Sequence, residues 1–209
     1  MLRRGAVAAA LLLVVLAAGC GGDKKQSAQT QREKTTNQPA QTDPKPVPKG
    51  VAGVIHVKTK LGTFAFKLDP ASSPNATRSF VRLTKRGFFN GLVFHRIVPS
   101  FVIQGGDPTG TGTGGPGYTT HDTVPPTTTY PLGTVAMAKT GQEPPGSAGS
   151  QFFVVTGRGV QFDGPFYAVI GNVTSGMPVV LTIGNQPSDP QTQAPLKPIV
   201  MQRVTYTAR

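Results

Sequence analysis

The sequence predicts a mainly β fold whose strands close into a barrel. Glycine (26) and proline (20) are abundant among the 209 residues, and only 37% of the residues are hydrophobic, which favours short strands and many turns over a helical bundle. About eight short runs carry the pattern of strands, whereas two segments show the apolar spacing of helices. Evenly spaced antiparallel strands remove their own edges by closing on one another, so we expect an eight-stranded antiparallel barrel.

The first half of the predicted domain contains a hairpin, a helix and a strand pair. Residues 54–57 and 64–68 have the composition of two strands joined by a turn. Ser73-Pro74 predicts a helix start, because serine suits the N-cap and proline suits the first helical position; the helix should end at Gly87. Residues 92–105 predict two short strands that turn at Pro99-Ser100.

The second half predicts three central strands, a second helix and a closing strand. Long loops are expected at 119–132 and 141–149, where threonine, proline and glycine dominate. The expected elements are strands at 133–138, 150–156, 167–173 and 199–206, and a helix over 175–183.

Residues 105–119 form a stretch rich in glycine. Gly110, Gly112 and Gly115 satisfy the pattern G-x-G-x-x-G, but no helix can start at Pro116-Gly117, so we reject a dinucleotide loop. The glycines suit close approach of the backbone to a bound peptide. A plain flexible loop remains the alternative.

The first nineteen residues predict an export signal. Arg3 and Arg4 precede an apolar run from Ala6 to Ala18, which is too short to span a bilayer comfortably. The run ends at Cys20, the one cysteine of the chain, which therefore cannot form an intrachain disulfide. The ending Leu-Ala-Ala-Gly-Cys resembles a bacterial lipobox, which implies cleavage before Cys20 and a lipid on its thiol. An uncleaved anchor helix is the alternative, and both place the domain outside the cytoplasm, beside a membrane.

The remaining chain divides into a tether and a domain. Residues 20–50 are rich in Gln, Thr, Pro and Lys, a composition that cannot bury a core, so we expect a disordered tether. The folded domain should occupy residues 51–209.

The formal net charge of +12 restricts the partners. A basic chain could bind nucleic acid, but the sequence has no cluster of Lys and Arg interleaved with aromatic residues. We therefore expect no nucleic-acid partner. Attraction to an anionic membrane or cell-wall surface accounts for the charge as well.

Arg96 places a permanent cation inside an apolar strand pair. A guanidinium is costly to bury without a partner, so Arg96 should lie at a surface or a cleft. Phe101, Val102 and Gln104 follow within one strand length, and they should form one small concave site with Arg96. The alternative is that Arg96 is a solvated strand residue.

Three segments in this order resemble the cyclophilins, the peptidyl-prolyl cis-trans isomerases. They are Phe94-His95-Arg96-Ile97 through Gln104-Gly105-Gly106-Asp107, then Ala136-Met137-Ala138 with Gly149-Ser150-Gln151-Phe152-Phe153, then Phe162-Asp163-Gly164 with Val169-Ile170-Gly171-Asn172-Val173. The likeness covers about residues 53–206. It implies an eight-stranded antiparallel barrel capped by two α-helices, which agrees with the elements expected above.

The resemblance also implies roles for individual residues. Arg96 looks like the catalytic arginine, with Phe101 and Gln104 as its catalytic neighbours. The implied substrate-binding residues are Val102, Gly112, Ala138, Lys139, Gln151, Phe153, Phe162 and Tyr167. No cofactor is implied, and the three histidines lack the spacing of a metal site.

We therefore expect a monomeric prolyl isomerase, lipid-anchored to the bacterial cell membrane, that acts on proline-containing segments of exported proteins. Two alternatives remain. One is a binding module for proline peptides in which turnover is incidental. The other is an envelope protein that uses its basic surface on acidic polymers.

Overall fold

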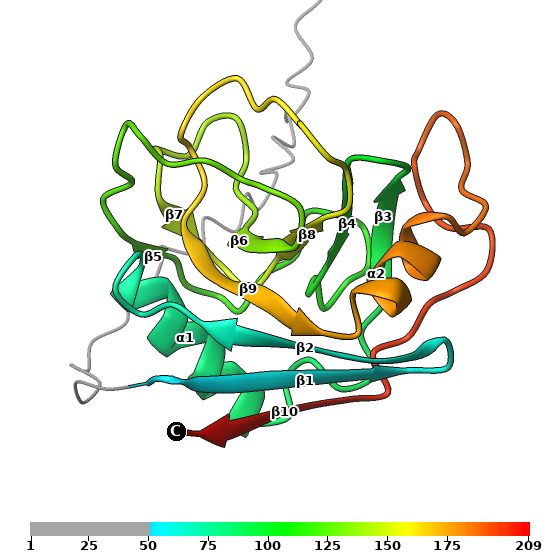
Figure 1. The fold of residues 1–209 in the computed structure, drawn as a ribbon, viewed down its shortest axis with the longest axis horizontal. Coiled ribbons are helices and arrows are strands. Elements are labelled where there is room, and N and C mark those ends of the chain that lie inside the picture. Colours follow the sequence, from blue (N-terminus) through cyan, green and yellow to red (C-terminus); the bar gives the residue numbers. More distant parts are fainter. Residues whose placement is uncertain (1–50) are drawn as a thin grey trace, which may run out of the picture. The chain divides into compact units, whose positions relative to one another are not determined.

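The computed structural model describes residues 51–209 (Figure 1). The predicted signal peptide (1–19) and the tether with Cys20 (20–50) lie outside the described residues. Within residues 51–209, neither helix has the length and hydrophobicity needed to cross a bilayer. The first described strand starts at Gly53.

The domain is built on one antiparallel sheet of eight strands, as the mainly β prediction required. In sheet order the strands are β10 (Arg203–Ala208), β1 (Gly53–Thr59), β2 (Gly62–Leu68), β9 (Val169–Ser175), β6 (Thr134–Met137), β8 (Phe152–Val155), β4 (Val102–Gly105) and β3 (Phe94–Val98). Figure 1 shows β10, β1 and β2 on one side of the domain, with β3 and β4 on the other. The hairpin β1–β2 and the pair β3–β4 confirm two predictions from the sequence.

The prediction of a closed barrel was wrong. The sheet curls through 206°, so it forms a half-barrel whose edge strands are β3 and β10. The two edges do not form a continuous ladder; the segment before β10 meets β3 through a bridge between Val93 and Val200 and through single backbone hydrogen bonds, such as that from the N–H of Phe94 to the carbonyl of Ile199. The segment that leads into β10 contains Pro195 and Pro198. Proline has no N–H to donate, so this segment cannot pair with β3 as a regular strand.

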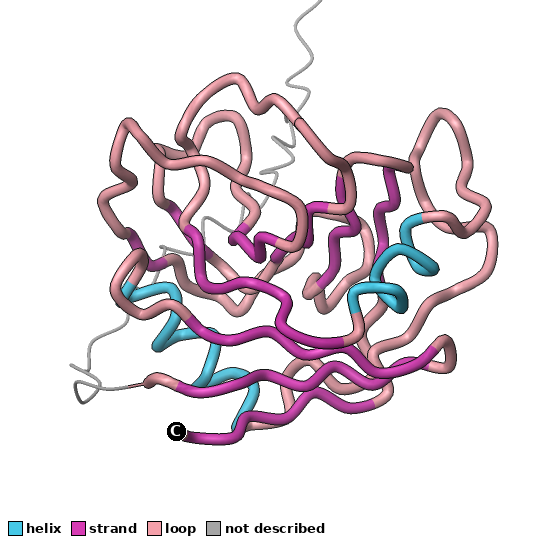
Figure 2. Tube along the Cα trace, in the orientation of Figure 1, coloured by secondary structure: helices cyan, strands magenta, loops and turns pink. Residues whose placement is uncertain are grey.

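Two helices pack on the sheet, α1 (Pro74–Lys85) and α2 (Met177–Gly184) (Figure 2). Both predicted helices are confirmed, with α2 starting two residues later than expected. Helix α1 ends before Gly87, whose φ of 71° is the left-handed conformation that glycine adopts without strain.

The start of α1 is capped by a residue that the sequence did not indicate. Ser73 occupies the N-cap position but its side chain makes no capping hydrogen bond. Asp122 accepts the free N–H groups instead, from Asn75 at 3.0 Å and Ala76 at 2.8 Å. A carboxylate there satisfies two unpaired donors and interacts favourably with the helix dipole.

A small second sheet brings Asp122 to that position. Strand β5 (Thr120–His121) pairs with β7 (Ser147–Ala148), and the N–H of Asp122 donates to the carbonyl of Gly146. Both strands lie in segments that we predicted to be loops. Two residues are too few to show the alternating pattern of a strand.

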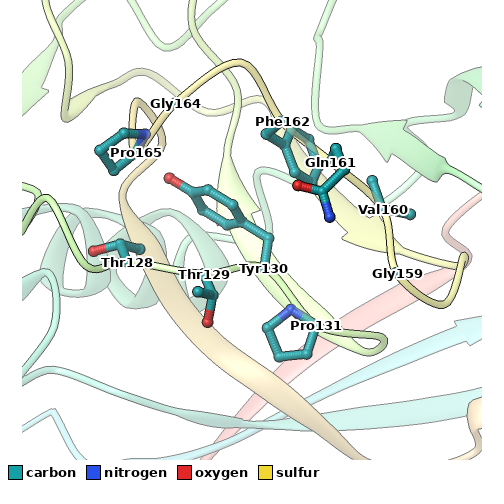
Figure 3. Close-up of a pocket in the computed structure, with 10 residues that line it drawn as sticks. All are labelled: Thr128, Thr129, Tyr130, Pro131, Gly159, Val160, Gln161, Phe162, Gly164 and Pro165. Carbon is teal, nitrogen blue, oxygen red and sulfur yellow. The ribbon is translucent and has the colours of Figure 1, made fainter.

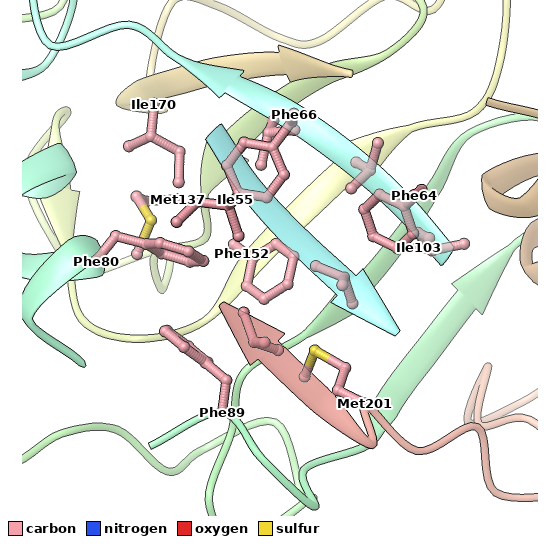
Figure 4. Packing of buried hydrophobic residues seen from close by; sticks show 14 of the residues in the cluster. Ile55, Phe64, Phe66, Phe80, Phe89, Ile103, Met137, Phe152, Ile170 and Met201 are labelled. Atoms are coloured by element: carbon pink, nitrogen blue, oxygen red, sulfur yellow. The ribbon is translucent and has the colours of Figure 1, made fainter. Parts of the chain in front are cut away.

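The main core fills the inside of the curl. Phe80 of α1 stacks on Phe89, with ring centroids 4.5 Å apart, and meets the edge of Phe152 of β8 at 5.3 Å. Figure 4 shows these rings together with Phe66 and Met137 from other strands. Aromatic side chains bury large apolar areas, so this cluster joins α1 to the concave face and leaves the convex face of β4, β6 and β8 for other residues.

The Asp122 contacts predict the stability of α1. Replacing Asp122 by alanine leaves the buried N–H of Ala76 and the partly buried N–H of Asn75 without this acceptor, so the free energy of unfolding should fall by about 2 kcal/mol. Urea unfolding followed by circular dichroism measures this change. Asp163→Ala, which removes an exposed carboxylate, is the control and should change stability by less than about 0.5 kcal/mol. Equal stabilities for the two variants would contradict the capping role.

Candidate active site

Strand alternation places the predicted site residues on the convex face of the sheet. In β4, Ile103 points into the main core, whereas Val102 and Gln104 point outward. Gln104 lies opposite Phe153 of β8, and Phe153 lies opposite Ala136 of β6. Side chains directly opposite on neighbouring strands share a face, so these residues form one surface.

An aromatic cluster covers part of this surface. Its members are Phe101, Tyr130, Phe153, Phe162 and Tyr167. Phe162 is central, with ring centroids 5.1 Å from Phe101, 4.8 Å from Tyr130 and 5.6 Å from Phe153. The structure therefore brings together four predicted aromatic residues. It adds Tyr130, which the sequence did not indicate because it lies in a stretch rich in threonine and proline.

Tyr130 fixes the rim of the aromatic cluster by two hydrogen bonds. Its hydroxyl donates to the carbonyl of Tyr167 at 3.0 Å and accepts from the N–H of the same residue at 2.8 Å. Burial raises the pKa of Tyr130, so the hydroxyl stays protonated and able to donate at neutral pH. The ring of Tyr167 then stands edge-on to Phe153 at 5.1 Å.

A pocket of about 350 Å³ lies beside this cluster (Figure 3). Tyr130 and Phe162 line it together with residues from the loops 128–131 and 159–165. Among the residues predicted to bind substrate, Phe162 alone lines this pocket. Phe162 therefore contributes to both the predicted site and the neighbouring hollow.

A chain of hydrogen bonds runs from Arg96 to the glycine-rich loop. Arg96 Nη1 donates to Gln104 Oε1 at 3.3 Å, and Gln104 Nε2 donates to Gln151 Oε1 at 3.0 Å. Gln151 Nε2 then donates to the carbonyls of Gly112 and Gly114, both at 2.9 Å. Four predicted residues are thus in contact, and the donors fix the orientation of both amides.

Arg96 has a second partner that the sequence did not indicate. Its Nε donates to Gln193 Oε1 at 2.6 Å. The backbone of Gln193 has a φ of 61°, and its carbonyl accepts the N–H of Ile97 at 2.8 Å. Gln193 lies 97 residues after Arg96, in a segment without regular structure, so no sequence pattern links the two.

The loop that carries Gln193 is held by Asp189. Its carboxylate accepts the N–H groups of Gln191 at 2.9 Å and Thr192 at 2.7 Å. These bonds favour the ionised form and lower the pKa of Asp189. The turn places Gln193 against β3, where it contacts both the backbone of the strand and the side chain of Arg96.

Both partners of Arg96 are neutral amides. Burial lowers the pKa of Arg96, while the nearby Tyr167 raises it; the guanidinium remains charged at neutral pH because its ordinary pKa is far higher. The guanidinium is therefore oriented without being neutralised. It forms a fixed positive charge beside the aromatic cluster, so it is not the freely solvated residue of the alternative reading.

Asp107 holds the glycine-rich loop in place. Oδ1 accepts from the N–H of Thr109 at 2.7 Å, and Oδ2 accepts from the N–H groups of Gly112 and Gly114. Burial opposes ionisation, but these donors outweigh it and lower the pKa of Asp107 to about 2. Gly112 has a φ of 88°, so a side chain there would be strained.

Lys139 differs from the other predicted contacts. Its Nζ donates to the carbonyls of Thr140 and Glu143, both at 2.9 Å, and therefore closes its own loop. Its neighbour Ala138 lies at the edge of the site, where its N–H donates to the carbonyl of Gln151 at 2.9 Å. Ala138 thus contacts the predicted site through its backbone N–H, whereas the ammonium group of Lys139 contacts the carbonyls of its own loop.

Within residues 51–209, no group of three or more His, Cys, Asp or Glu side chains has the geometry to hold a metal ion.

His95 lies under the glycine-rich loop. Burial lowers its pKa, with Asp107 raising and Arg96 lowering it, so the ring is neutral at pH 7. The described side chains offer hydrogen-bond donation by a fixed cation next to an apolar surface.

Comparison with known proteins places this arrangement in a family. The family model "Cyclophilin type peptidyl-prolyl cis-trans isomerase/CLD" matches residues 54–206. Peptidyl-prolyl cis-trans isomerase B of Bacillus subtilis is 41% identical over 121 residues, covering 57% of this chain and 82% of that protein. The protein of the same name from Streptomyces anulatus is 36% identical over 175 residues, covering 73% of this chain and 95% of that protein.

A solved structure has a similar fold. The cyclophilin-type peptidyl-prolyl cis-trans isomerase of Cryptosporidium parvum, determined in the presence of the dipeptide Ala-Pro, is 29% identical and superposes with a TM-score of 0.68. The match covers 75% of this chain and 99% of that one.

The low pKa of Asp107 predicts how the glycine-rich loop responds to acid. A depressed pKa contributes stability above the unfolded value near 4, and that contribution is lost as the pH falls through about 2. The amide NMR signals of Gly112 and Gly114 should therefore shift together with a midpoint near pH 2. In Asp107→Asn, whose amide does not titrate, these shifts should be absent. A midpoint near pH 4 in the unmodified chain would contradict the hydrogen-bonding account.

Proposed function

The chain belongs to the cyclophilin-type peptidyl-prolyl cis-trans isomerases, and from that membership we propose that Arg96 and the aromatic cluster accelerate X-Pro rotation in exported proteins. The isomerase activity is common to its named relatives. The proposal adds which residues catalyse the rotation, which proteins are the clients, and where in the cell the domain acts.

The reaction determines what the site must supply. Rotation about a peptide bond meets a barrier of about 18–20 kcal/mol, because resonance is lost in the twisted state. The proline nitrogen then becomes a hydrogen-bond acceptor. A donor aimed at that nitrogen stabilises the twisted state more than either planar form, so it lowers the barrier instead of only tightening binding.

One observation carries the assignment to Arg96. Gln193 accepts the N–H of Nε, and Gln104 accepts one N–H of Nη1. A guanidinium has five N–H donors in all. Both terminal nitrogens therefore keep N–H groups for a ligand. Since the two partners are neutral amides, the full charge is directed at the substrate. The rigid fork needs no titration, which suits catalysis over a wide pH range.

The substrate contacts follow from the surrounding residues. Phe101, Val102 and Phe153 offer an apolar surface to the pyrrolidine ring, with Phe162 and Tyr167 at its rim. A proline-containing ligand is supported by the related structure determined in the presence of Ala-Pro. In this proposal Gln151, Ala138 and Gly112 line the path of the extended peptide on either side of the proline. Lys139 stays a predicted contact, since it would first have to leave its own loop.

The location completes the proposal. The leader and Cys20 support an exported lipoprotein whose tether, residues 20–50, holds a monomeric catalytic domain near the outer surface of the cell membrane. Proteins that fold after export would be its clients. Labelling with radioactive palmitate tests the anchor separately from catalysis. The full chain should carry the label and stay with the membrane fraction, whereas Cys20→Ser should do neither.

Arg96→Ala tests the catalytic assignment. Loss of one charged hydrogen bond in the twisted state, worth about 1.5–3 kcal/mol, should lower kcat/KM by about 10- to 150-fold. A protease-coupled assay on an Ala-Pro-containing peptide measures this, and circular dichroism checks that the domain remains folded. Unchanged catalysis in a folded variant would reject the mechanism. Retained peptide binding without turnover in the unmodified chain would favour the binding-module alternative.

Gln193→Met tests whether Gln193 is a positioning residue. Methionine keeps the approximate length and volume, but its thioether is only a weak acceptor for Arg96 Nε, so the guanidinium should lose much of its orientation. We expect kcat to fall about 3- to 10-fold, equivalent to about 0.7–1.4 kcal/mol, with little change in KM. Gln191→Met is the matched control in the same loop and should keep both constants. A change in KM alone would argue against positioning.

A further inference from the structure

The outer face of β10, β1 and β2 carries a concentration of positive charge. Along β1, Ile55 and Val57 are fully buried while His56 and Lys58 are exposed. The strand register then places Arg203 of β10 opposite Lys58, and Lys67 of β2 opposite Val54. We call this surface the basic face; its cations are Lys58, Lys67, Arg203 and the following Arg209, and His56 lies among them.

These cations lack acidic partners on their own surface. The other outward-facing residues of the three strands, as the structure describes them, are Val54, Thr63, Ala65, Thr205 and Thr207. Asp69 follows β2, but its carboxylate accepts from the backbone of Ala71 and Ser72 and closes its own turn. The charge of the basic face is therefore not compensated within the surface.

The arrangement has a cost for folding. Lys58 and Arg203 are directly opposite on neighbouring strands, and like charges in that position repel. A sheet surface that only had to be soluble would be more stable with mixed charges. Repulsion of this kind is relieved when an anionic partner binds.

A hollow on the same surface offers further polar groups. A pocket of about 410 Å³ is lined by the cation of Arg209, by His56, and by residues 174–175 and Thr207, which carry hydroxyls. Cations together with hydroxyl donors suit the oxygens of a phosphate group.

We propose that the basic face docks the domain on a bilayer that contains anionic phospholipids. Each Lys or Arg near such a surface adds to the attraction. The proposal rests on the location proposed above, because a lipid on Cys20 would place the domain within reach of the bilayer. The chain also enters at this face: Arg209 N–H donates to the carbonyl of Ala52 at 3.2 Å, so the described chain begins beside the end of β10.

Docking in this orientation leaves the active site open. The basic face lies on β10, β1 and β2, at one end of the sheet order, whereas Arg96 and Gln104 lie on β3 and β4 at the other. A sheet that curls through 206° turns the outer surfaces of its two ends in nearly opposite directions. Figure 1 shows these strand groups on opposite sides of the domain. The bilayer would hold one side while peptides reach the other.

The test uses residues 51–209, which contain every described element. A related structure consists almost wholly of this domain, since 99% of that chain is covered, so we expect the domain to fold without an extension. Co-sedimentation with vesicles of phosphatidylcholine containing about 30% phosphatidylglycerol should show binding that weakens steeply as salt rises. Vesicles of phosphatidylcholine alone should bind at least tenfold more weakly.

Paired variants separate this face from net charge. Lys58→Gln with Arg203→Gln should weaken vesicle binding at least fivefold, with unchanged kcat/KM and equal or higher thermal stability. The matched control, Arg158→Gln with Lys197→Gln, removes the same charge from exposed loop positions outside the basic face. It should bind the vesicles almost as well as the unmodified domain.

Two results would overturn the proposal. One is equal weakening by both pairs of substitutions, which would mean that net charge alone drives adsorption. The other is binding to a soluble acidic polymer, such as a teichoic-acid-type polyphosphate, without binding to anionic vesicles. Since Arg96 lies outside the basic face, a failed catalytic assignment would leave vesicle binding unchanged, and the two failures can be told apart.

Discussion

The hydrogen bonds between Arg96 and two neutral amides are the constraint on which the proposed active site depends. Gln104 holds Nη1 and Gln193 holds Nε, so the guanidinium is fixed from two sides. A carboxylate in either position would also orient the arginine, but it would neutralise the charge and compete with the substrate nitrogen. Neutral partners supply orientation while leaving the field directed at the ligand. The glycine-rich loop depends on the same chain of bonds, because Gln151 links Gln104 to the carbonyls of Gly112 and Gly114.

The curled sheet keeps this polar site apart from the main core. Side chains alternate along each strand, so Ile103 and Phe152 fill the inside of the curl while Gln104 and Phe153 form the outer surface. The core and the site therefore share the same short strands without sharing side chains. The same alternation in β1 produces the basic face at the other end of the sheet. One structural rule thus accounts for a core, a proposed catalytic surface and a charged surface on one domain.

Local features of the fold were predictable because local chemistry specifies them. The hairpin β1–β2, helix α1 after Ser73-Pro74 and the turn at Ser100 follow from alternation, capping preference and turn residues. Closure of the barrel was not predictable in this way. It depends on whether the segment before β10 pairs with β3 along a regular ladder, and that segment has prolines at 195 and 198. Strands β5 and β7 were missed because two residues carry no periodic signal, and with them the link between Asp122 and α1.

For this protein, the sequence alone determined the family, the mainly β class, and the order in which Arg96, the glutamines and the aromatic residues occur. The tertiary structure alone decided that Gln193 orients Arg96, that Tyr130 completes the aromatic cluster, and that the sheet stays open. It also revealed that Lys139 closes its own loop. The physical reason is separation along the chain: motifs record contacts between near neighbours, whereas Arg96 and Gln193 are 97 residues apart and meet only after the sheet has curled.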